Sequence, residues 1–550
     1  MIERFLPRTE FASYEDFIEN YRINIPDEFN FGFDIIDQWA TRDSEKMALV
    51  WCNDQGEEKR LTYADLSRLS NQAANYFSRI GIRKGDVVMC ILRRRHEYWV
   101  SAIALCKLGA TIIPATMQLT AKDIVYRVNA AQVKALVCVD DPFVVAQVEQ
   151  AAPNCPTLEH RILTGRRSGW QCFADAIAGL PEEFARPTGS ARIQNSDPML
   201  VYFTSGTTGM PKMVLHDFVH PLGHIVTAKY WQQVQENRLH LSVSDSGWAK
   251  FGWGKIYGQM ICGATIFAYD MDKFVPATLM DKLQQYAITT FCAPPTMFRF
   301  MLAEGMGEYD LSSIEHCGNA GEPLSFELFE KVQSILKLKM AEGFGQSESS
   351  VLIANFPWFE PKPGSMGKPA PLYDIDLIAP DGHSCDPGEE GEIVIRNIGA
   401  VGLFRGYYKS PELTERAFAG GVYNTGDVAW RDNDGYYWFV GRNDDVIKCS
   451  GYRIGPFEVE SALSEHDAVL ECAITAAPDP KRGQVVKATV VLNRGYTPSG
   501  ELVKELQQHV KRITAPYKYP RVIEFVDELP KTISGKIKRA EIRQGDHFSD

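Results

Sequence analysis

The sequence predicts an α/β fold, with a large N-terminal domain of doubly wound sheets plus a β-rich subdomain, followed by a small α+β C-terminal domain. Helical and strand-like segments alternate from residue 62 onward, short strands crowd residues 370–443, and a polar break at 441–445 precedes about a hundred residues with their own alternation. Such alternation is typical of parallel sheets covered by helices. A chain of 550 residues is also too long for one ordinary core.

The first half of the chain shows the clearest alternation. Thr62 can cap a helix that reaches about Ile80, where Gly81 ends it. A second helix is expected to end at Leu108, because Gly109 follows it. The remaining elements expected here are strands at 87–92, 111–114 and 135–139 and a helix that starts at Thr120. Together they predict a parallel sheet with helices on both faces.

The later chain repeats this unit once and then becomes richer in strands. A helix ending near Tyr286, a strand at 288–292 and a helix opened by Pro294-Pro295 form the repeat. Short strands separated by Gly/Asp turns are expected at 374–378, 392–395 and 436–440, and the last hundred residues are expected to contain strands at 472–475 and 485–492 and a helix at 500–513. These patterns divide the chain into domains at 1–443 and 444–550, with the boundary at Asp444.

Composition excludes several classes of protein. Hydrophobic residues make up 45% of the chain and charged residues 23%, and the net charge is −12, which does not favour a nucleic-acid binder. The twelve cysteines show no metal-ligand spacing and are interpreted as buried thiols in a reducing compartment. The start of the chain lacks an apolar signal core, and no run of about 18 apolar residues predicts a membrane span. We therefore expect a cytoplasmic protein without a membrane span.

One loop has the composition of a phosphate cradle. It contains Thr204, Ser205, Gly206, Thr207, Thr208, Gly209 and Lys212, between apolar strand-like runs. Glycines let backbone N–H groups turn toward an anion, hydroxyls add neutral donors, and the lysine adds a positive charge. The Walker A spacing is absent. Taken alone, a loop of this composition is more often a flexible surface turn.

Further polar groups follow other predicted strands, each with an ordinary structural alternative. Ala320-Gly321-Glu322 is a tight turn, which can either leave room for the flat base of a nucleotide or be an ordinary turn without a binding role. A second motif is Glu342-Gly343-Phe344-Gly345-Gln346-Ser347-Glu348. The Phe344 ring can stack on a flat group. Glu348 can be a hard oxygen ligand suited to Mg²⁺, or alternatively a solvated glutamate. Asp427 can hold ribose hydroxyls or form an Asx turn. Arg442 follows it, and its charged guanidinium can bind an anion or can simply be exposed to solvent. The segment 530–539, which includes Lys536, is basic and could be a solvated tail.

The order of these motifs decides between the alternatives. The series TSGTTGMPK, AGEP, GFGQSE, YNTGD, GRNDDVIKCSGYRIGPFEVE and PKTISGKI resembles the adenylate-forming superfamily of acyl-CoA synthetases, luciferases and adenylation domains, over residues 30–540. SDSGWAK and PDPKRG look most like medium-chain acyl-CoA synthetases. Departures are small: Ser347 stands where Thr is usual, and Phe344 where Tyr is common.

The resemblance implies a reaction in two steps, in which a carboxylic acid and ATP form an acyl-adenylate and diphosphate, and CoA then displaces AMP. In the first step Lys536 matches the catalytic lysine, Glu348 would hold Mg²⁺ and take part in catalysis, and the 204–212 loop would hold the β- and γ-phosphates. Asp427 would hold the ribose, and Arg442 is a further ATP-binding residue. The adenine side would comprise Ala320, Gly321, Glu322, Glu342, Gly343, Phe344, Gly345, Gln346 and Ser347. No protein nucleophile is needed.

For the second step the resemblance implies that the small domain is mobile and turns about Asp444. This turn withdraws Lys536 and presents Ser450, Gly451, Tyr452 and Arg453 to CoA, with Arg482 as a further phosphate contact. The acyl pocket would involve Trp231, Trp248, Trp253, Cys292 and Gly345. Bulky rings shorten a pocket, so a short-to-medium or branched apolar acid is expected. Lys250 could pair with a polar substrate group, although a solvent-facing position is the commoner fate of lysine.

Two other functions share many of these motifs. A stand-alone adenylation enzyme could load a carrier protein instead of CoA. A nucleotide-binding regulatory module without turnover is the alternative from another class, but Lys536, Glu348 and Asp427 together argue against it. The sequence leaves the oligomeric state open.

Overall fold

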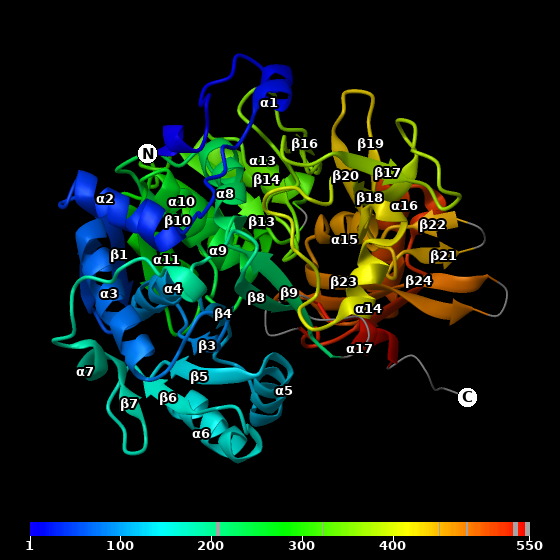
Figure 1. The fold of residues 1–550 in the computed structure, drawn as a ribbon. Helices are drawn as coiled ribbons and strands as arrows, with labels where there is room; N and C mark the ends of the chain where they lie inside the picture. Colours follow the sequence, from blue (N-terminus) through cyan, green and yellow to red (C-terminus); the bar gives the residue numbers. More distant parts are fainter. Residues whose placement is uncertain (205–209, 323, 450–451, 480–481, 532–536, 545–550) are drawn as a thin grey trace.

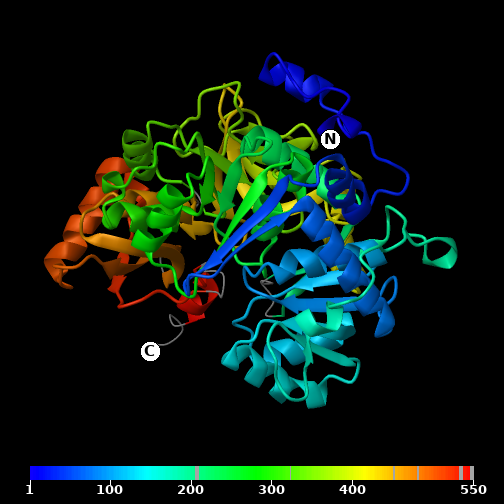
Figure 2. The same cartoon turned by 90° about the vertical axis from the view of Figure 1, so that its left-hand side faces the viewer.

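The computed structural model describes residues 1–550 except 205–209, 323, 450–451, 480–481, 532–536 and 545–550. Within the described ranges the strands form four sheets, of seven, nine, four and five strands. In both Figure 1 and Figure 2, the five-stranded sheet (orange to red) lies on the opposite side of the molecule from the outer strands of the seven-stranded sheet (cyan). The α/β class predicted from the sequence is confirmed.

The seven-stranded sheet carries the predicted phosphate loop at its edge. Its order is β7-β6-β5-β3-β4-β8-β9, and all neighbours are parallel except β8 and β9. Its strands are β3 (Val87–Ile91), β4 (Thr111–Pro114), β5 (Val133–Cys138), β6 (His160–Leu163), β7 (Gln171–Cys172), β8 (Pro198–Thr204) and β9 (Lys212–Asp217). The helices in this part of the chain are α3 (Tyr63–Arg79), α4 (Glu97–Leu108), α5 (Ala121–Ala131), α6 (Pro142–Ala151) and α7 (Phe173–Ile177).

The predicted helix ends here are confirmed. Thr62 and Thr120 each form a reciprocal capping box, with Asp65 and Asp123, which satisfies backbone N–H groups that the first turn leaves unpaired. Gly109 ends α4 in the left-handed conformation, with φ of 80°, a conformation that glycine adopts without a steric penalty.

The nine-stranded sheet carries the AGEP and GFGQSE motifs, in the order β16-β15-β14-β13-β12-β10-β11-β1-β2. Its strands are β1 (Met47–Asn53), β2 (Glu58–Thr62), β10 (Leu239–Ser242), β11 (Thr265–Asp270), β12 (Thr290–Ala293), β13 (His316–Ala320), β14 (Ala341–Phe344), β15 (Ile353–Ala354) and β16 (Lys368–Pro369). Its helical segments are α8 (His220–Ile225), η5 (Val226–Trp231), α9 (Ala249–Lys255), α10 (Tyr257–Ile261), α11 (Pro276–Gln285), α12 (Pro295–Ala303) and α13 (Phe326–Leu336), and α1 (Tyr14–Asn20) and α2 (Asp37–Arg42) precede it.

The last two sheets divide the C-terminal third of the chain. The antiparallel four-stranded sheet contains β17 (Ile375–Ile378), β18 (Glu390–Ile395), β19 (Tyr423–Arg431) and β20 (Tyr437–Arg442), with α14 (Pro411–Ala417) before β19. The five-stranded sheet contains β21 (Ile447–Cys449), β22 (Tyr452–Ile454), β23 (Val469–Asp479), β24 (Gly483–Leu492) and β25 (Val522–Phe525), with α15 (Pro456–Ser464), α16 (Gly500–Ile513) and α17 (Arg539–Gln544). The chain passes between these sheets at 443–446, and the domain boundary at Asp444 stays a prediction.

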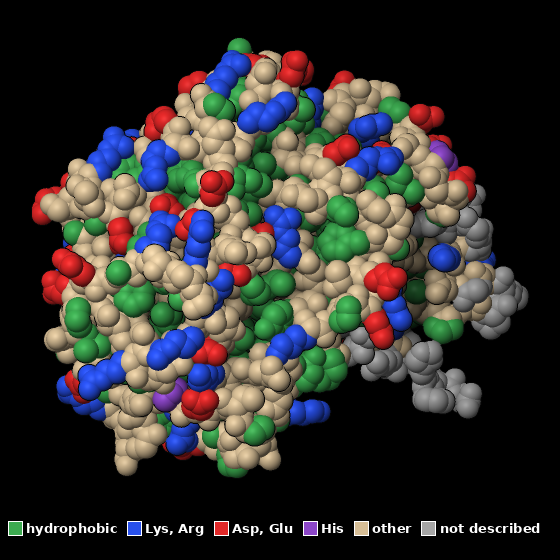
Figure 3. All heavy atoms as spheres, viewed as in Figure 1, with side chains coloured by type: hydrophobic (Ala, Val, Ile, Leu, Met, Phe, Trp, Pro, Cys, Tyr) green, Lys and Arg blue, Asp and Glu red, His purple; other side chains and the backbone are tan. Residues whose placement is uncertain are grey.

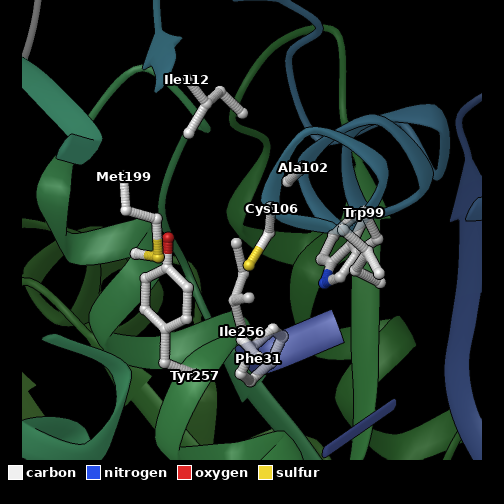
Figure 4. Close-up of a pocket in the computed structure, with 9 residues that line it drawn as sticks. Phe31, Trp99, Ala102, Cys106, Ile112, Met199, Ile256 and Tyr257 are labelled. Carbon is white, nitrogen blue, oxygen red and sulfur yellow. The ribbon is translucent and has the colours of Figure 1, made fainter. Parts of the chain in front are cut away.

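A small internal cavity lies between α4, the strands β4 and β8, and α10. Its volume is about 10 Å³, and its lining, drawn in Figure 4, includes Trp99, Ile112, Met199 and Tyr257. About 10–15 Å³ is needed for one water, which also needs polar partners. This cavity is therefore too small and too apolar to be a substrate site.

The surface and the helices add two observations. Acidic and basic side chains are interspersed on the face seen in Figure 3. In the described part of the chain, none of the helices combines the length and the apolar character that crossing a membrane requires.

Candidate active site

The predicted phosphate loop joins two antiparallel strands, as expected. Thr204 ends β8, Lys212 begins β9, and the two residues are paired in register. Both are partly exposed. Residues Ser205, Gly206, Thr207, Thr208 and Gly209 lie outside the described residues. The strand pair therefore fixes both ends of the loop, and Lys212 stands where the chain leaves it.

Glu348 is partly buried and makes a specific contact through one carboxylate oxygen. The Tyr407 hydroxyl donates to Glu348 Oε1 at 3.0 Å. Burial raises the pKa of the Glu348 carboxyl, while the hydrogen bond from Tyr407 and the charges of Lys212 and Arg442 act in the opposite direction. A cation at this carboxylate would further favour its charged form. The position therefore suits a hard cation such as Mg²⁺, which prefers oxygen ligands and is commonly held by one or two carboxylates plus phosphates.

A second group of contacts surrounds Asp427. Gln346 Nε2 donates to Asp427 Oδ2 at 2.5 Å, and Gln346 Oε1 accepts from the Tyr423 hydroxyl at 2.6 Å. Arg442 lies within 3.3 Å of Asp427 Oδ1 and donates to the Thr425 carbonyl at 3.0 Å. The structure thus brings together three predicted site residues: Asp427 and Arg442, which are paired on the neighbouring strands β19 and β20, and Gln346, which is 81 residues from Asp427 in sequence.

His216 is a site neighbour that the sequence interpretation missed. Its Nε2 donates to the Ser347 carbonyl at 2.7 Å, and the side chain is fully buried. Burial lowers the pKa of His216 to about 4, so the ring is neutral at pH 7 and acts as a hydrogen-bond donor. It anchors the backbone between Gln346 and Glu348 to β9.

The predicted adenine side lies where β13 and β14 end. Ala320 pairs with Gly343 in register, and Gly321 has a φ of 100° that favours glycine. Glu322 accepts hydrogen bonds from Thr296, and the Phe344 ring packs 6.1 Å from Phe439. The Glu342 carboxyl is buried, which raises its pKa well above the usual range. The two strand ends therefore bring both motifs to one edge of the sheet.

The predicted acyl-pocket residues are only partly brought together. The Trp231 and Trp253 rings meet edge to face at 6.4 Å, and a Cβ added at Gly345 would lie 2.2 Å from Trp253 Cη2. Cys292 Sγ lies 3.8 Å from a Cβ added at Gly318, which also faces Trp231. Trp248 precedes α9 and is partly exposed, and no ring contact joins it to the other two tryptophans in the described part of the structure.

The position of the Lys250 side chain differs from the expectation that it faces solvent. It is partly buried, and its Nζ donates to the Ala320 carbonyl at 2.7 Å. A buried ammonium keeps its charge only when acceptors surround it, and this carbonyl supplies one. The expectation that Lys250 points to solvent is wrong, because the sequence does not show that β13 ends beside α9.

The predicted residues of the C-terminal domain are less fully described. Lys536, Ser450 and Gly451 lie outside the described residues. Tyr452 and Arg453 belong to β22, which pairs with β21, and Arg482 is exposed in the β23–β24 connection, where its backbone N–H donates to Asp479. Asp444 lies 3.7 Å from Arg442, measured from carboxylate oxygen to Nε. Arg442 therefore lies near both Asp427 and the predicted hinge.

Tyr407 and Tyr423 were also missed as site residues, for different reasons. Tyr423 stands inside the motif that ends in Asp427, so its position offered a signal. Tyr407 is 59 residues from Glu348 in sequence, and nothing in its local pattern indicates the contact.

Comparison with known proteins places this arrangement in a family. The AMP-binding enzyme family model matches residues 36–408, and the model of the AMP-binding enzyme C-terminal domain matches residues 458–536. The acyl-coenzyme A synthetase ACSM3, mitochondrial, of Pongo abelii is 39% identical over 97% of this chain and 92% of the relative. ACSM4, mitochondrial, of Homo sapiens is 42% identical over 94% of this chain and 91% of the relative.

A solved structure shows the same likeness. The anthranilate CoA ligase AuaEII in complex with anthranoyl-AMP is 28% identical, with a TM-score of 0.87 over 95% of this chain and 98% of that one. The expectation of a cytoplasmic location is contradicted by the curated relatives, whose names place them in mitochondria. The family models, the near-full-length relatives and the shared fold agree: this chain belongs to the AMP-binding enzyme family and is an AMP-forming, ATP-dependent acyl-CoA synthetase.

Proposed function

We propose that this synthetase activates a short-to-medium or branched apolar acid, with Mg²⁺ accompanying ATP, through the residues described above. The observation that supports the site assignment most is the pair of contacts that join Glu348 to Tyr407 and Gln346 to Asp427. Through these contacts the two carboxylates proposed to hold Mg²⁺ and the ribose, Glu348 and Asp427, lie near opposite ends of the short segment 346–348, which supports the proposed adenylating site.

The first step needs two anions to approach each other. A carboxylate oxygen attacks the α-phosphorus, and the bond to the β-phosphate oxygen breaks so that diphosphate leaves. In the proposed arrangement Lys212 and the 204–212 loop hold the leaving diphosphate, Asp427 holds the ribose hydroxyls, and Lys536 offsets charge between the two reactants. Mg²⁺ at Glu348 would neutralise phosphate oxygens.

The size of the acid is proposed to depend on how Trp253 packs over Gly345. The glycine leaves no side chain between the ring and the backbone, and an added Cβ would also lie 2.8 Å from the Ser350 carbonyl. The bulky ring therefore lies directly against the backbone at Gly345, where it would shorten a pocket. This packing, together with Trp231, supports a short-to-medium or branched acid.

Gly345→Ala is expected to lower the free energy of unfolding by about 1–3 kcal/mol, the usual range for overpacking. Because the methyl must displace Trp253, kcat/KM should change unequally among acids of different length. Melting temperature and an acid series measured on both proteins test this. Gly399→Ala is the matched control, since nothing lies within 4 Å of its added Cβ. Equal behaviour of the two variants would contradict the proposed acyl site.

Asp444→Pro is expected to uncouple the two half-reactions if the chain turns at Asp444. Proline fixes φ near −65° and so restricts the backbone rotation that a hinge needs. Adenylate formation and thioester formation from supplied acyl-adenylate should then change by different factors in separate assays. Unchanged overall turnover would show that the chain does not turn at Asp444.

A diphosphate-release screen tests the function directly. Short, branched, medium-chain and aromatic acids are compared at fixed ATP and Mg²⁺, and the thiol acceptor is varied between CoA and a holo-carrier protein. The proposal expects the highest kcat/KM with an apolar short-to-medium or branched acid and with CoA. A clear preference for an aromatic acid would refute the proposed substrate class.

A further inference from the structure

Tyr407 contacts the two charged groups that the proposed function assigns to the phosphates and their cation. Its hydroxyl donates to Glu348 Oε1 at 3.0 Å, and the Lys212 ammonium lies 5.1 Å from the centre of its ring. The ring face is negative and attracts a cation, whereas the hydroxyl donates to an anion. One side chain thus holds a positive and a negative group at different places on its surface.

Backbone hydrogen bonds, ring packing and burial hold Tyr407 in place. Tyr407 forms an antiparallel bridge with Val214 of β9, and its N–H donates to Thr414 Oγ1 at 2.8 Å. The N–H of nearby Phe404 donates to the Glu348 carbonyl at 2.7 Å, and the Phe404 ring packs edge to face on Tyr407 at 5.1 Å. Tyr407 itself is only 8% exposed. Its orientation is therefore fixed by the fold before any ligand binds.

Lys212 and Glu348 do not pair directly with each other. They have opposite charges and lie close enough for Lys212 to influence the Glu348 carboxyl. Yet no ion pair within 4.0 Å joins these two described residues, and each instead contacts a different part of Tyr407. A direct pair would neutralise both charges and withdraw them from the phosphates and the cation.

We infer that Tyr407 is a positioning residue, which keeps Lys212 available for the leaving diphosphate and orients Glu348 toward Mg²⁺. This inference rests on the proposed function for those two residues. The hydroxyl holds one carboxylate oxygen, which would leave the other to bind the cation, and the negative face of the ring attracts the ammonium. Residues that orient metal-binding side chains in this way commonly change metal affinity by about 10–100-fold when replaced.

Two variants separate the contributions of the hydroxyl and the ring. Tyr407→Phe keeps the ring and should raise the Mg²⁺ concentration for half-maximal adenylation by about tenfold or more, while binding of ATP in EDTA stays unchanged. Tyr407→Leu also removes the ring, and should weaken binding of ATP in EDTA by about 2- to 30-fold. Calorimetry of ATP binding with Mg²⁺ or with EDTA provides a readout independent of turnover.

Tyr408→Phe is the control, because it removes the hydroxyl of the neighbouring tyrosine, which packs against the apolar core of the seven-stranded sheet, and melting temperatures identify any loss of fold. The inference is overturned if Tyr407→Phe binds ATP like the unaltered enzyme under both conditions, or if it weakens both equally. Failure of the proposed function would look different, since the unaltered enzyme would then show no Mg²⁺-dependent, acid-dependent diphosphate release. A selective loss of Mg²⁺ dependence in Tyr407→Phe supports the inference.

Discussion

Lys536→Ala is expected to lower the rate of acyl-adenylate formation by about 10³-fold, the upper range for removal of one charge-stabilising group. The lysine would interact most strongly with charge that moves between the carboxylate and the α-phosphate, so kcat should fall more than ATP affinity. Single-turnover diphosphate release measures the first step. Thioester formation from supplied acyl-adenylate measures the second, which should stay close to that of the unaltered enzyme.

A neighbouring lysine provides the control for this variant. Lys538 pairs with Glu541 on the surface at 2.7 Å, with both side chains well exposed, and such a pair contributes little to stability. Lys538→Ala should therefore leave both steps close to normal. An equal loss of both half-reactions in Lys536→Ala would contradict the proposed division of roles.

Glu348→Gln is expected to reduce adenylate formation by about 10²- to 10³-fold, because it removes the negative charge that would hold the cation beside the phosphates. The amide is nearly the same size and can still accept the Tyr407 hydrogen bond, so the fold should be retained. Unlike Lys536→Ala, this variant should shift the Mg²⁺ dependence to higher concentration. A Mg²⁺ titration of diphosphate release, with ATP binding measured in EDTA, separates the two effects.

A surface glutamate tests whether the effect is specific. Glu360 is 79% exposed in its side chain and pairs with Lys339, so Glu360→Gln should leave the Mg²⁺ dependence unchanged. If Glu348→Gln showed the same Mg²⁺ dependence as the unaltered enzyme, Glu348 would not be the residue that holds the cation.

Local signals in the sequence predicted most secondary structure because they act within one turn or one strand. Thr62 and Thr120 predict helix starts, and in the structure each is paired with an aspartate only three residues further on. Gly109 ends a helix through its own backbone freedom. Such interactions depend on neighbours along the chain, so a single sequence is enough to find them.

Long-range contacts could not be predicted in the same way. The expectation that Lys250 faces solvent was wrong, because its ammonium donates a hydrogen bond to the carbonyl of Ala320, which is 70 residues away in sequence. His216 and Tyr407 contact the 347–348 segment from 131 and 59 residues away. Neither residue belongs to a motif that carries chemistry by itself, so only the folded chain shows that they support the site.

The sequence by itself determined the family reaction, because the series TSGTTGMPK, AGEP, GFGQSE and YNTGD resembles the adenylate-forming superfamily, and recognising it needs no knowledge of positions in space. It also predicted the α/β class, since helix caps and apolar runs act locally. Tertiary structure decided how the motifs are connected: Tyr407 contacts both Lys212 and Glu348, Gln346 hydrogen-bonds Asp427, and Trp253 packs against Gly345. These relations depend on which strands lie side by side, and strand pairing is fixed by the packing of the whole sheet rather than by neighbouring residues.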